Sequence, residues 1–233
     1  MTGIGIVVAL DAEARTLRDV RRWRGGGDRL DGRATLIVSG IGPAAAGRAA
    51  RTIAEAGAAA LVSWGVAGGL DPRLRPGTLV LPAEVLGPAG ERYPTSAAWR
   101  ERERRTLAAR DPVCGGTILS QDTAIADPRT KQAAHRTSGA VAIDMESAAI
   151  AAVAASRGLP FLVVRAIVDT ASDALPAAVV DASRDGRPDV RRLLAGLLRS
   201  PADLPALVGL AGRFRAARRA LAAAASAGLA TPA

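Results

Sequence analysis

The sequence predicts an α/β fold, a three-layer αβα sandwich whose central sheet is mixed but mostly parallel. Short apolar runs alternate along the chain with longer segments of helix-forming residues, an order that places helices on both faces of a parallel sheet. Hydrophobic residues make up 49% of the 233 residues and aromatic residues only 3%, which predicts a core of small and branched side chains. We expect a single domain over residues 1–233, with a helical C-terminal extension at about 189–225.

The first quarter of the chain contains three expected strands and two expected helices. Asp11 and Glu13 fall in the first turn of the first helix, where carboxylates suit the helix dipole. Pro43 suits the first position of the second helix, and Gly57 ends it. In chain order the elements are strand Ile4–Leu10, helix Asp11–Arg22, strand Arg33–Ser39, helix Pro43–Ala56 and strand Ala59–Trp64.

The rest of the chain repeats this alternation, and its strongest strand signal is the apolar run Pro160–Val168. Gly158 ends the helix before that run. The expected elements are loop Asp71–Gly77, strand Thr78–Pro82, helix Thr95–Ala109, strand Thr117–Ser120, helix Asp127–His135, strand Ala140–Ile143, helix Asp144–Arg157, strand Pro160–Val168, loop Asp169–Pro188 and helical residues from Asp189 to Ala225.

Composition and charge exclude several functional classes. The net charge is +9, almost all of it from Arg, and Lys131 is the only lysine. The basic residues are scattered without interleaved aromatic residues, which argues against a nucleic-acid partner. One Cys (Cys114) and one His (His135) allow no disulfide and give no expected metal site. With no basic leader and no apolar run of about 18 residues, we expect a cytoplasmic protein.

Two glycine segments follow expected strands. Residues 40–45 fit the dinucleotide pattern G-x-G-x-x-A, but the next strand ends at Trp64 without the acidic residue that would hold a ribose. An oxidoreductase of the dinucleotide-binding type is therefore disfavoured, and a turn that brings Gly40 and Gly42 close to another ligand is favoured. The second segment, Gly65–Gly69, permits close approach of a ligand or serves as a bend that the fold needs.

Acidic residues also follow the expected strands. Asp144 and Glu146 come after one strand, where they cap a helix or serve a site. Asp169 closes the strongest strand, a position for a turn former or for a buried acid with a raised pKa. Because ligands of parallel α/β sheets bind outside the carboxyl ends of the strands, we expect these side chains to meet there.

Together, and in this order, six segments between about Gly3 and Pro176 resemble the nucleoside phosphorylase and nucleosidase superfamily. Their layout is most similar to that of methylthioadenosine/S-adenosylhomocysteine nucleosidases. The segments are Ala9–Glu13, Ser39–Gly42, Gly65–Leu70, Ser120–Asp122, Asp144–Ala149 and Val164–Asp169. The C-terminal part, Asp185–Pro188 and Leu193–Leu207, resembles the hopanoid-associated phosphorylases, a branch linked to removal of adenine from adenosylhopane.

The resemblance implies cleavage of a purine N-ribosidic bond without a cofactor. It makes Asp169 the general acid that protonates purine N7, and Glu146 the group that binds the ribose hydroxyls and stabilises the sugar cation. It makes Glu13 the residue that orients or deprotonates the attacking water. The substrate-binding residues that it implies are Met145, Ala124, Ile125, Ser39, Gly40, Gly42, Val66, Ala67, Gly68 and Val168.

Departures from the family pattern leave alternatives open. Val66 and Val168 stand where relatives often carry Ser. Neither Gly40–Gly47 nor Gly65–Leu70 contains an Arg that could bind phosphate, and Arg48 and Arg165 are only nearby in the sequence. This favours water as nucleophile, while phosphate as co-substrate stays open. A nucleosidase for methylthioadenosine or S-adenosylhomocysteine and a non-catalytic nucleoside-binding protein also remain, although binding alone does not need three carboxylates.

The expected partners are small molecules and a second copy of the chain. The purine nucleoside is lipid-linked if the hopanoid resemblance holds. The helices after Asp189 combine leucines with arginines, a pattern that fits either peripheral membrane contact or packing on the sheet. The resemblance also implies a homodimer.

Overall fold

The computed structural model describes residues 3–17, 28–30, 34–108, 112–176, 179 and 204–227. The described strands form one mixed, mostly parallel sheet in the order β2-β3-β1-β4-β10-β9-β6-β7, with β11 beside β4 and with β5 and β8 following β11. The strands are β1 Gly3–Val8, β2 Asp28–Leu30, β3 Ala34–Val38, β4 Ala58–Gly69, β5 Leu79–Val80, β6 Glu84–Leu86, β7 Arg92–Pro94, β8 Val113–Cys114, β9 Thr117–Ser120, β10 Ala142–Asp144 and β11 Phe161–Asp169.

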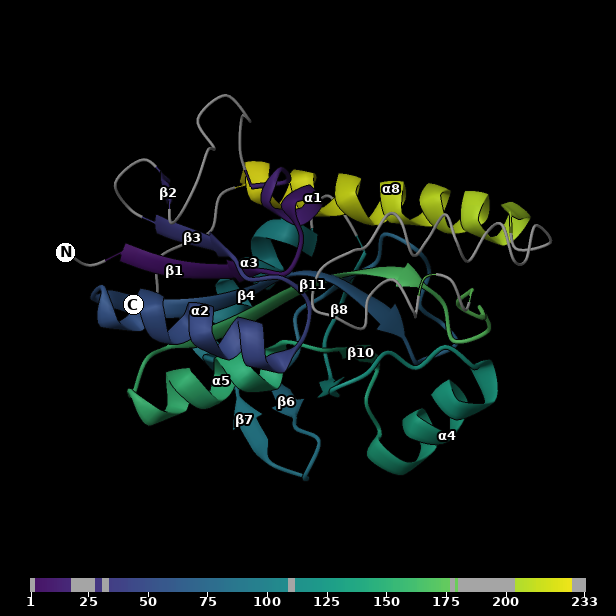
Figure 1. Cartoon of the computed structure of the whole chain (residues 1–233), viewed down its shortest axis with the longest axis horizontal. Helices are drawn as coiled ribbons and strands as arrows, with labels where there is room; N and C mark the ends of the chain where they lie inside the picture. The colour runs from purple at the N-terminus through teal and green to yellow at the C-terminus, as the bar shows by residue number, and fades with distance from the viewer. Residues whose placement is uncertain are drawn as a thin grey trace.

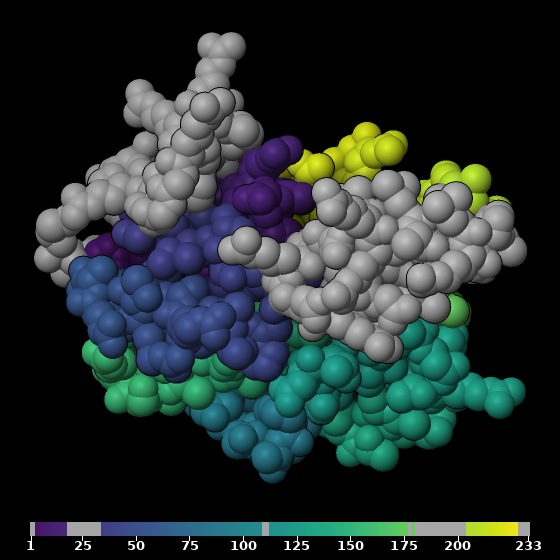
Figure 2. All heavy atoms as spheres, in the orientation of Figure 1, coloured from purple at the N-terminus to yellow at the C-terminus, as the bar shows by residue number. Residues whose placement is uncertain are grey.

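Helices cover both faces of this sheet, so the predicted three-layer αβα architecture is confirmed. One face carries α8, which packs on β11 and β4 beside α1 and α3 (Figure 1). The other face carries α2 and α5, which lie side by side in the space-filling view (Figure 2). The helices are α1 Asp11–Ala14, α2 Pro43–Glu55, α3 Ala97–Ala108, α4 Pro128–Ser138, α5 Ser147–Ser156 and α8 Leu204–Ala227.

The core is built on the parallel pairing of β4 with β11, which runs from Leu61 opposite Phe161 to Ala67 opposite Ile167. Successive side chains of a strand point to opposite faces, so Trp64 packs toward α8 while Leu61 packs toward α2 and α5. Both strands are buried on both faces, which explains their nearly continuous apolar sequences.

The C-terminal helix α8 differs along its length. Its last turns bury Ala217, Leu221 and Ala224 against the sheet, while Leu204 and Val208 near its beginning are exposed. Within the described part of the predicted helical extension, the last turns thus pack on the sheet. Residues 189–203 lie outside the described part. Among the described helices, none is long and apolar enough to cross a bilayer.

Two predicted boundaries near the glycine and acidic segments are wrong. The segment Gly65–Gly69 is not a bend but the continuation of β4, because residues 65–67 pair with β11 and residues 68 and 69 pair with β10. Helix α5 begins at Ser147 rather than at Asp144, since Asp144 is the last residue of β10 and pairs with Ser120.

The first predicted helix is also too long, because α1 is one short turn followed by turn residues up to Leu17, and residues 18–22 lie outside the described part. Four short strands, β2, β6, β7 and β8, were not predicted. Each has two or three residues, too few for a hydrophobic period to be read from the sequence.

A buried hydrogen bond between the turn that follows α1 and strand β4 gives a first prediction. Trp64 is fully buried, and its Nε1 donates to Thr16 Oγ1 at 2.9 Å. We expect Thr16→Val to lower the free energy of unfolding by about 1–3 kcal/mol, because the isosteric side chain leaves this indole N–H without its acceptor.

Chemical denaturation measures this change against Thr106→Val, a substitution of the same type on the exposed surface of α3. The control is expected to stay within about 0.5 kcal/mol of the parent protein. Equal effects of the two substitutions would contradict the prediction.

Candidate active site

A cavity of about 470 Å³ opens at the carboxyl ends of β1, β4, β10 and β11. Most of its lining is apolar, and Glu13, Asp144, Glu146 and Asp169 bring carboxyl groups to it. Of the residues predicted from the sequence, the lining includes Glu13, Val66, Ala67, Gly68, Ala124, Ile125, Met145, Glu146, Val168 and Asp169. It also includes Leu207 and Leu210 of the apolar face expected in the C-terminal helices. The residues in the lining that were not predicted include Leu10, Ile41, Leu175, Val179 and Phe214.

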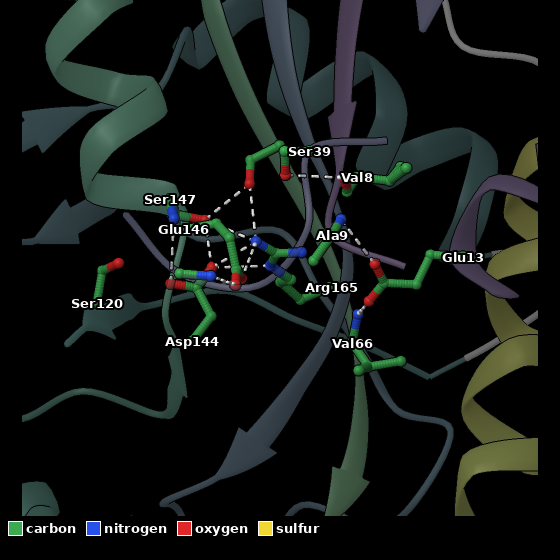
Figure 3. A network of polar contacts seen from close by, with 12 residues as sticks. Val8, Ala9, Glu13, Ser39, Val66, Ser120, Asp144, Glu146, Ser147 and Arg165 are labelled. Carbon is green, nitrogen blue, oxygen red and sulfur yellow. Dashed lines mark hydrogen bonds and ion pairs between the residues drawn. The ribbon is translucent and has the colours of Figure 1, made fainter. Parts of the chain in front are cut away.

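Glu13 lies on the first helical turn after β1, with its carboxylate buried between strands (Figure 3). Oε2 accepts from the backbone N–H groups of Ala9 and Leu10 at 3.0 and 2.9 Å, and Oε1 accepts from that of Val66 at 2.8 Å. Burial raises the pKa of Glu13, while Arg165 and these three donors oppose the rise. The side chain is therefore fixed by the backbone of β4 and of the two residues that follow β1.

Glu146 lies between β10 and α5, and the glycine turn before α2 holds it. The backbone N–H of Gly42 donates to Glu146 Oε1 at 2.9 Å, and Gly42 adopts a φ of 96° that favours glycine. Burial raises the pKa of Glu146 to about 7, with the negative charge of Asp144 adding to the rise and Arg165 opposing it. This carboxyl group therefore changes its charge near neutral pH.

Arg165, a fully buried residue of β11, holds these acidic groups together (Figure 3). Its Nε and Nη2 lie 2.8 and 2.7 Å from Asp144 Oδ2, and Nη2 lies 3.6 Å from Glu146 Oε2. Nη2 also donates to Ser63 Oγ at 2.8 Å and to Ser147 Oγ at 3.3 Å. The sequence showed Arg165 inside the strongest strand but gave no position for its side chain.

Asp169 ends β11 and is paired with a residue to which the sequence reasoning gave no role. Lys131 of α4 is completely buried, and its Nζ forms an ion pair with Asp169 Oδ2. The same Nζ donates to the carbonyl oxygens of Thr170 at 3.0 Å and Asp173 at 2.8 Å. Burial raises the pKa of Asp169, and Lys131 opposes the rise. The one feature of the sequence that could have pointed to Lys131 is that it is the single Lys of an Arg-rich chain.

Other predicted residues lie beside the cavity without lining it. Ser39 Oγ donates to the carbonyl oxygens of Val8 and Gly40, so this side chain stabilises the turn. Gly42 reaches the site through its N–H group only, and Ile41 lines the cavity between the two glycines. Arg48 is exposed on α2.

The described lining favours an uncharged, partly polar small molecule. None of the described residues that line the cavity is Arg or Lys. Within the described residues, His, Cys, Asp and Glu also form no group of three that could hold a metal ion. The polar groups that remain are carboxyls, which accept hydrogen bonds from hydroxyl groups, stabilise positive charge, or donate a proton when they are protonated.

Comparisons with known proteins show the family and the fold. The family model described as "Phosphorylase superfamily" matches residues 4–199. The 5′-methylthioadenosine/S-adenosylhomocysteine nucleosidase of Mycobacterium bovis is 29% identical to this chain, over 72% of this chain and 86% of that protein.

Solved structures show the same fold. The nucleosidase of this name from Neisseria meningitidis, in complex with methylthio-immucillin-A, has a TM-score of 0.69 at 22% identity, covering 97% of this chain and 98% of that one. The enzyme from Helicobacter pylori, with butyl-thio-DADMe-Immucillin-A, has a TM-score of 0.70 at 18% identity and the same coverage.

The close packing around Gly65 gives a second prediction. A Cβ atom at Gly65 would lie 2.3 Å from Arg165 Nη1 and 2.5 Å from Glu13 Oε1. Both side chains are held by several hydrogen bonds, so we expect Gly65→Ala to lower the free energy of unfolding by about 1–3 kcal/mol.

Gly47→Ala is the matched control. A Cβ atom at Gly47 would meet its nearest neighbours at 3.6 Å, inside helix α2, where alanine is favoured over glycine by up to about 1 kcal/mol. Denaturation curves in which Gly65→Ala is as stable as Gly47→Ala would contradict the prediction. They would show that Arg165 and Glu13 leave room for a Cβ atom at residue 65.

Proposed function

The chain belongs to the phosphorylase superfamily, and we propose that it is an N-ribosyl hydrolase that releases adenine from a purine nucleoside. The observation that carries this proposal is the convergence of Glu13, Glu146 and Asp169, from three separate segments, on one cavity. Cleavage of an N-ribosidic bond involves three tasks, which are protonation of the leaving base, stabilisation of the sugar cation and placement of the nucleophile, and the three carboxyl groups can serve one each. The names of the relatives support the same reaction.

Asp169 acts on the leaving base in this mechanism. As the C1′–N9 bond breaks, its electron pair goes to the purine, and N7 takes the proton of the Asp169 carboxyl group. Burial favours the protonated form of this carboxyl group, and general-acid catalysis of this type contributes about 10²–10⁴-fold to the rate. Ala124 and Ile125, which line the cavity, are proposed to contact the adenine.

Glu146 and Glu13 act on the sugar and the water. Glu146 accepts hydrogen bonds from the ribose 2′ and 3′ hydroxyls, and its charge stabilises the cation, while Met145 packs on the sugar. Water attacks C1′ and transfers a proton to Glu13, whose position is fixed by three backbone N–H groups. Water is preferred to phosphate because the described lining contains no cation to bind a phosphate group.

The remaining part of the cavity supports a substrate with an apolar 5′ substituent. The lining includes five apolar side chains, Leu175, Val179, Leu207, Leu210 and Phe214, against which a ribose-linked hydrocarbon would lose its contact with water. The resemblance of the C-terminal part to the hopanoid-associated phosphorylases implies adenosylhopane, in hopanoid biosynthesis, as the proposed substrate, and the apolar lining is compatible with it. Methylthioadenosine, with a smaller apolar 5′ group, is the second candidate, which the relatives' names favour.

Cellular context is part of the same proposal. The exposed Leu204 and Val208 lie at the beginning of α8, the helix that also lines the cavity, and a peripheral contact of this end with a membrane would admit a lipid-linked nucleoside. A homodimer is proposed from the family resemblance alone, and the cytoplasmic location remains the expectation from the sequence.

Release of adenine from adenosylhopane, methylthioadenosine and adenosine, each with and without phosphate, tests the function. We expect the largest kcat/KM for adenosylhopane, with ribose rather than ribose 1-phosphate as the sugar product. Asp169→Asn is expected to release adenine about 10²–10⁴-fold more slowly while still binding substrate. Phosphate-dependent release would replace water as the nucleophile, and absence of release from all three would remove the proposed activity.

The pKa of Glu146 predicts the acidic limb of the pH profile. This carboxyl group must be ionised to accept from the ribose hydroxyls and oppose the cation, so kcat/KM should fall as the pH drops below about 7. Asp169 must be protonated, so kcat should fall at higher pH. Glu146→Gln should lower kcat/KM and move the acidic limb to the position set by Glu13. An unchanged limb in this variant would contradict the assignment.

A further inference from the structure

The ammonium group of Lys131 has three acceptors around it. Two of them, the carbonyl oxygens of Thr170 and Asp173, only accept hydrogen bonds. The third is Asp169 Oδ2, whose carboxyl group is the proposed acid. Lys131 is 0% exposed, so water does not compete for these contacts. A charge removed from water this completely is costly unless it is paired, which indicates that the pairing with Asp169 is its main compensation.

The contact fixes the direction of the Asp169 carboxyl group. Its side-chain hydrogen bond to Lys131 occupies Oδ2, and the preceding residue, Val168, has no hydrogen-bonding side chain to share this task. Two rigid elements, α4 and β11, carry the two partners. With Oδ2 bound, Oδ1 is the oxygen left to carry a proton toward a ligand in the cavity.

We propose that Lys131 is a positioning residue for the leaving-group proton transfer: it orients Asp169 and stabilises the carboxylate that forms when the base takes the proton. This inference rests on the proposed function. In the step, the Asp169 O–H bond breaks, N7 of the base gains the proton, and the C1′–N9 electron pair goes to the base. The negative charge that appears on Asp169 then lies directly against the Lys131 ammonium group.

Such a pairing is weak in the ground state and strong in the transition state. With Asp169 protonated, the ammonium faces a neutral carboxyl group, and as the proton leaves, it faces a growing negative charge in a low-dielectric surrounding. Only an interaction that strengthens toward the transition state raises kcat. Lys131 is therefore expected to affect kcat rather than KM.

Two other charged groups face this pair. Asp173 lies near Asp169 and raises its pKa, whereas Arg213 of α8 lowers it and lies 3.4 Å from Asp173 Oδ1. These two opposing groups pair with each other, and Lys131 is the strongest influence that lowers the pKa of Asp169. Removal of Lys131 should therefore move the alkaline limb of kcat to higher pH, by about one unit or more.

Two neutral substitutions test this proposal, Lys131→Met and Lys131→Gln, the second of which keeps N–H donors for the two carbonyl oxygens. Each is assayed with an adenine nucleoside and with 4-nitrophenyl β-D-riboside, whose phenolate leaves without being protonated. We expect kcat for the adenine nucleoside to fall by about 10- to 100-fold, a part of the whole acid contribution. KM and turnover of the nitrophenyl riboside should change little, which also shows that the variants are folded.

The control is Arg157→Met, which removes an exposed cation that pairs with Glu55 outside the cavity lining and should leave kcat for both substrates nearly unchanged. Equal losses on both substrates, or an alkaline limb that does not move, would overturn the positioning role of Lys131. Normal adenine release by both Lys131 variants, together with an inactive Asp169→Asn variant, would also overturn the positioning role. That result would leave the proposed function intact. Full activity of Asp169→Asn would instead remove the proposed acid itself.

Discussion

The buried guanidinium of Arg165 is the constraint on which the candidate site depends. It lies between Asp144 and Glu146, and its charge also acts on Glu13. Without it, three carboxyl groups would be buried close together with no cation between them, an arrangement that favours protonation over ionisation. Because Arg165 belongs to β11, the strand that holds Asp169, the sheet places the organising cation and the proposed acid in a single rigid segment.

The carboxyl groups differ in their surroundings, and this difference allows separate roles. Glu13 accepts three backbone hydrogen bonds, Glu146 accepts one and lies 3.6 Å from Arg165 Nη2, and Asp169 faces an ammonium group. Environments that set the pKa values of neighbouring acids apart are how one cavity performs acid and base chemistry at the same pH. The protein achieves this with backbone groups and two buried cations.

The alternation of apolar runs and helix formers predicted the three layers of the fold. It did so because β4 and β11 are buried on both faces, and their sequences are therefore almost continuously apolar. The positions of Glu13, Glu146 and Asp169 could also be predicted, since each follows a strand and parallel strands end at one edge. The partners of Arg165 and Lys131 could not be predicted. Asp144 is 21 residues from Arg165 and Asp169 is 38 residues from Lys131, and no local pattern reports a contact over such separations. The extended conformation of Gly65–Gly69 was not predicted. It is maintained by hydrogen-bonded pairing with β10 and β11, and not by the local preference of its residues.

The uneven burial of α8 means that its two halves can tolerate different substitutions in evolution. Its last turns pack on the sheet through Ala217 and Leu221, whereas Leu207, Leu210 and Phe214, which are nearer the beginning of the same helix, line the cavity. Substitutions in the cavity-facing half can therefore remodel which molecules the enzyme admits while the anchored half and the buried charges beneath it stay unaltered. A helix arranged in this way allows the ligand preference to change through substitutions at a few cavity-facing positions. The residues proposed to carry the reaction need not change at the same time.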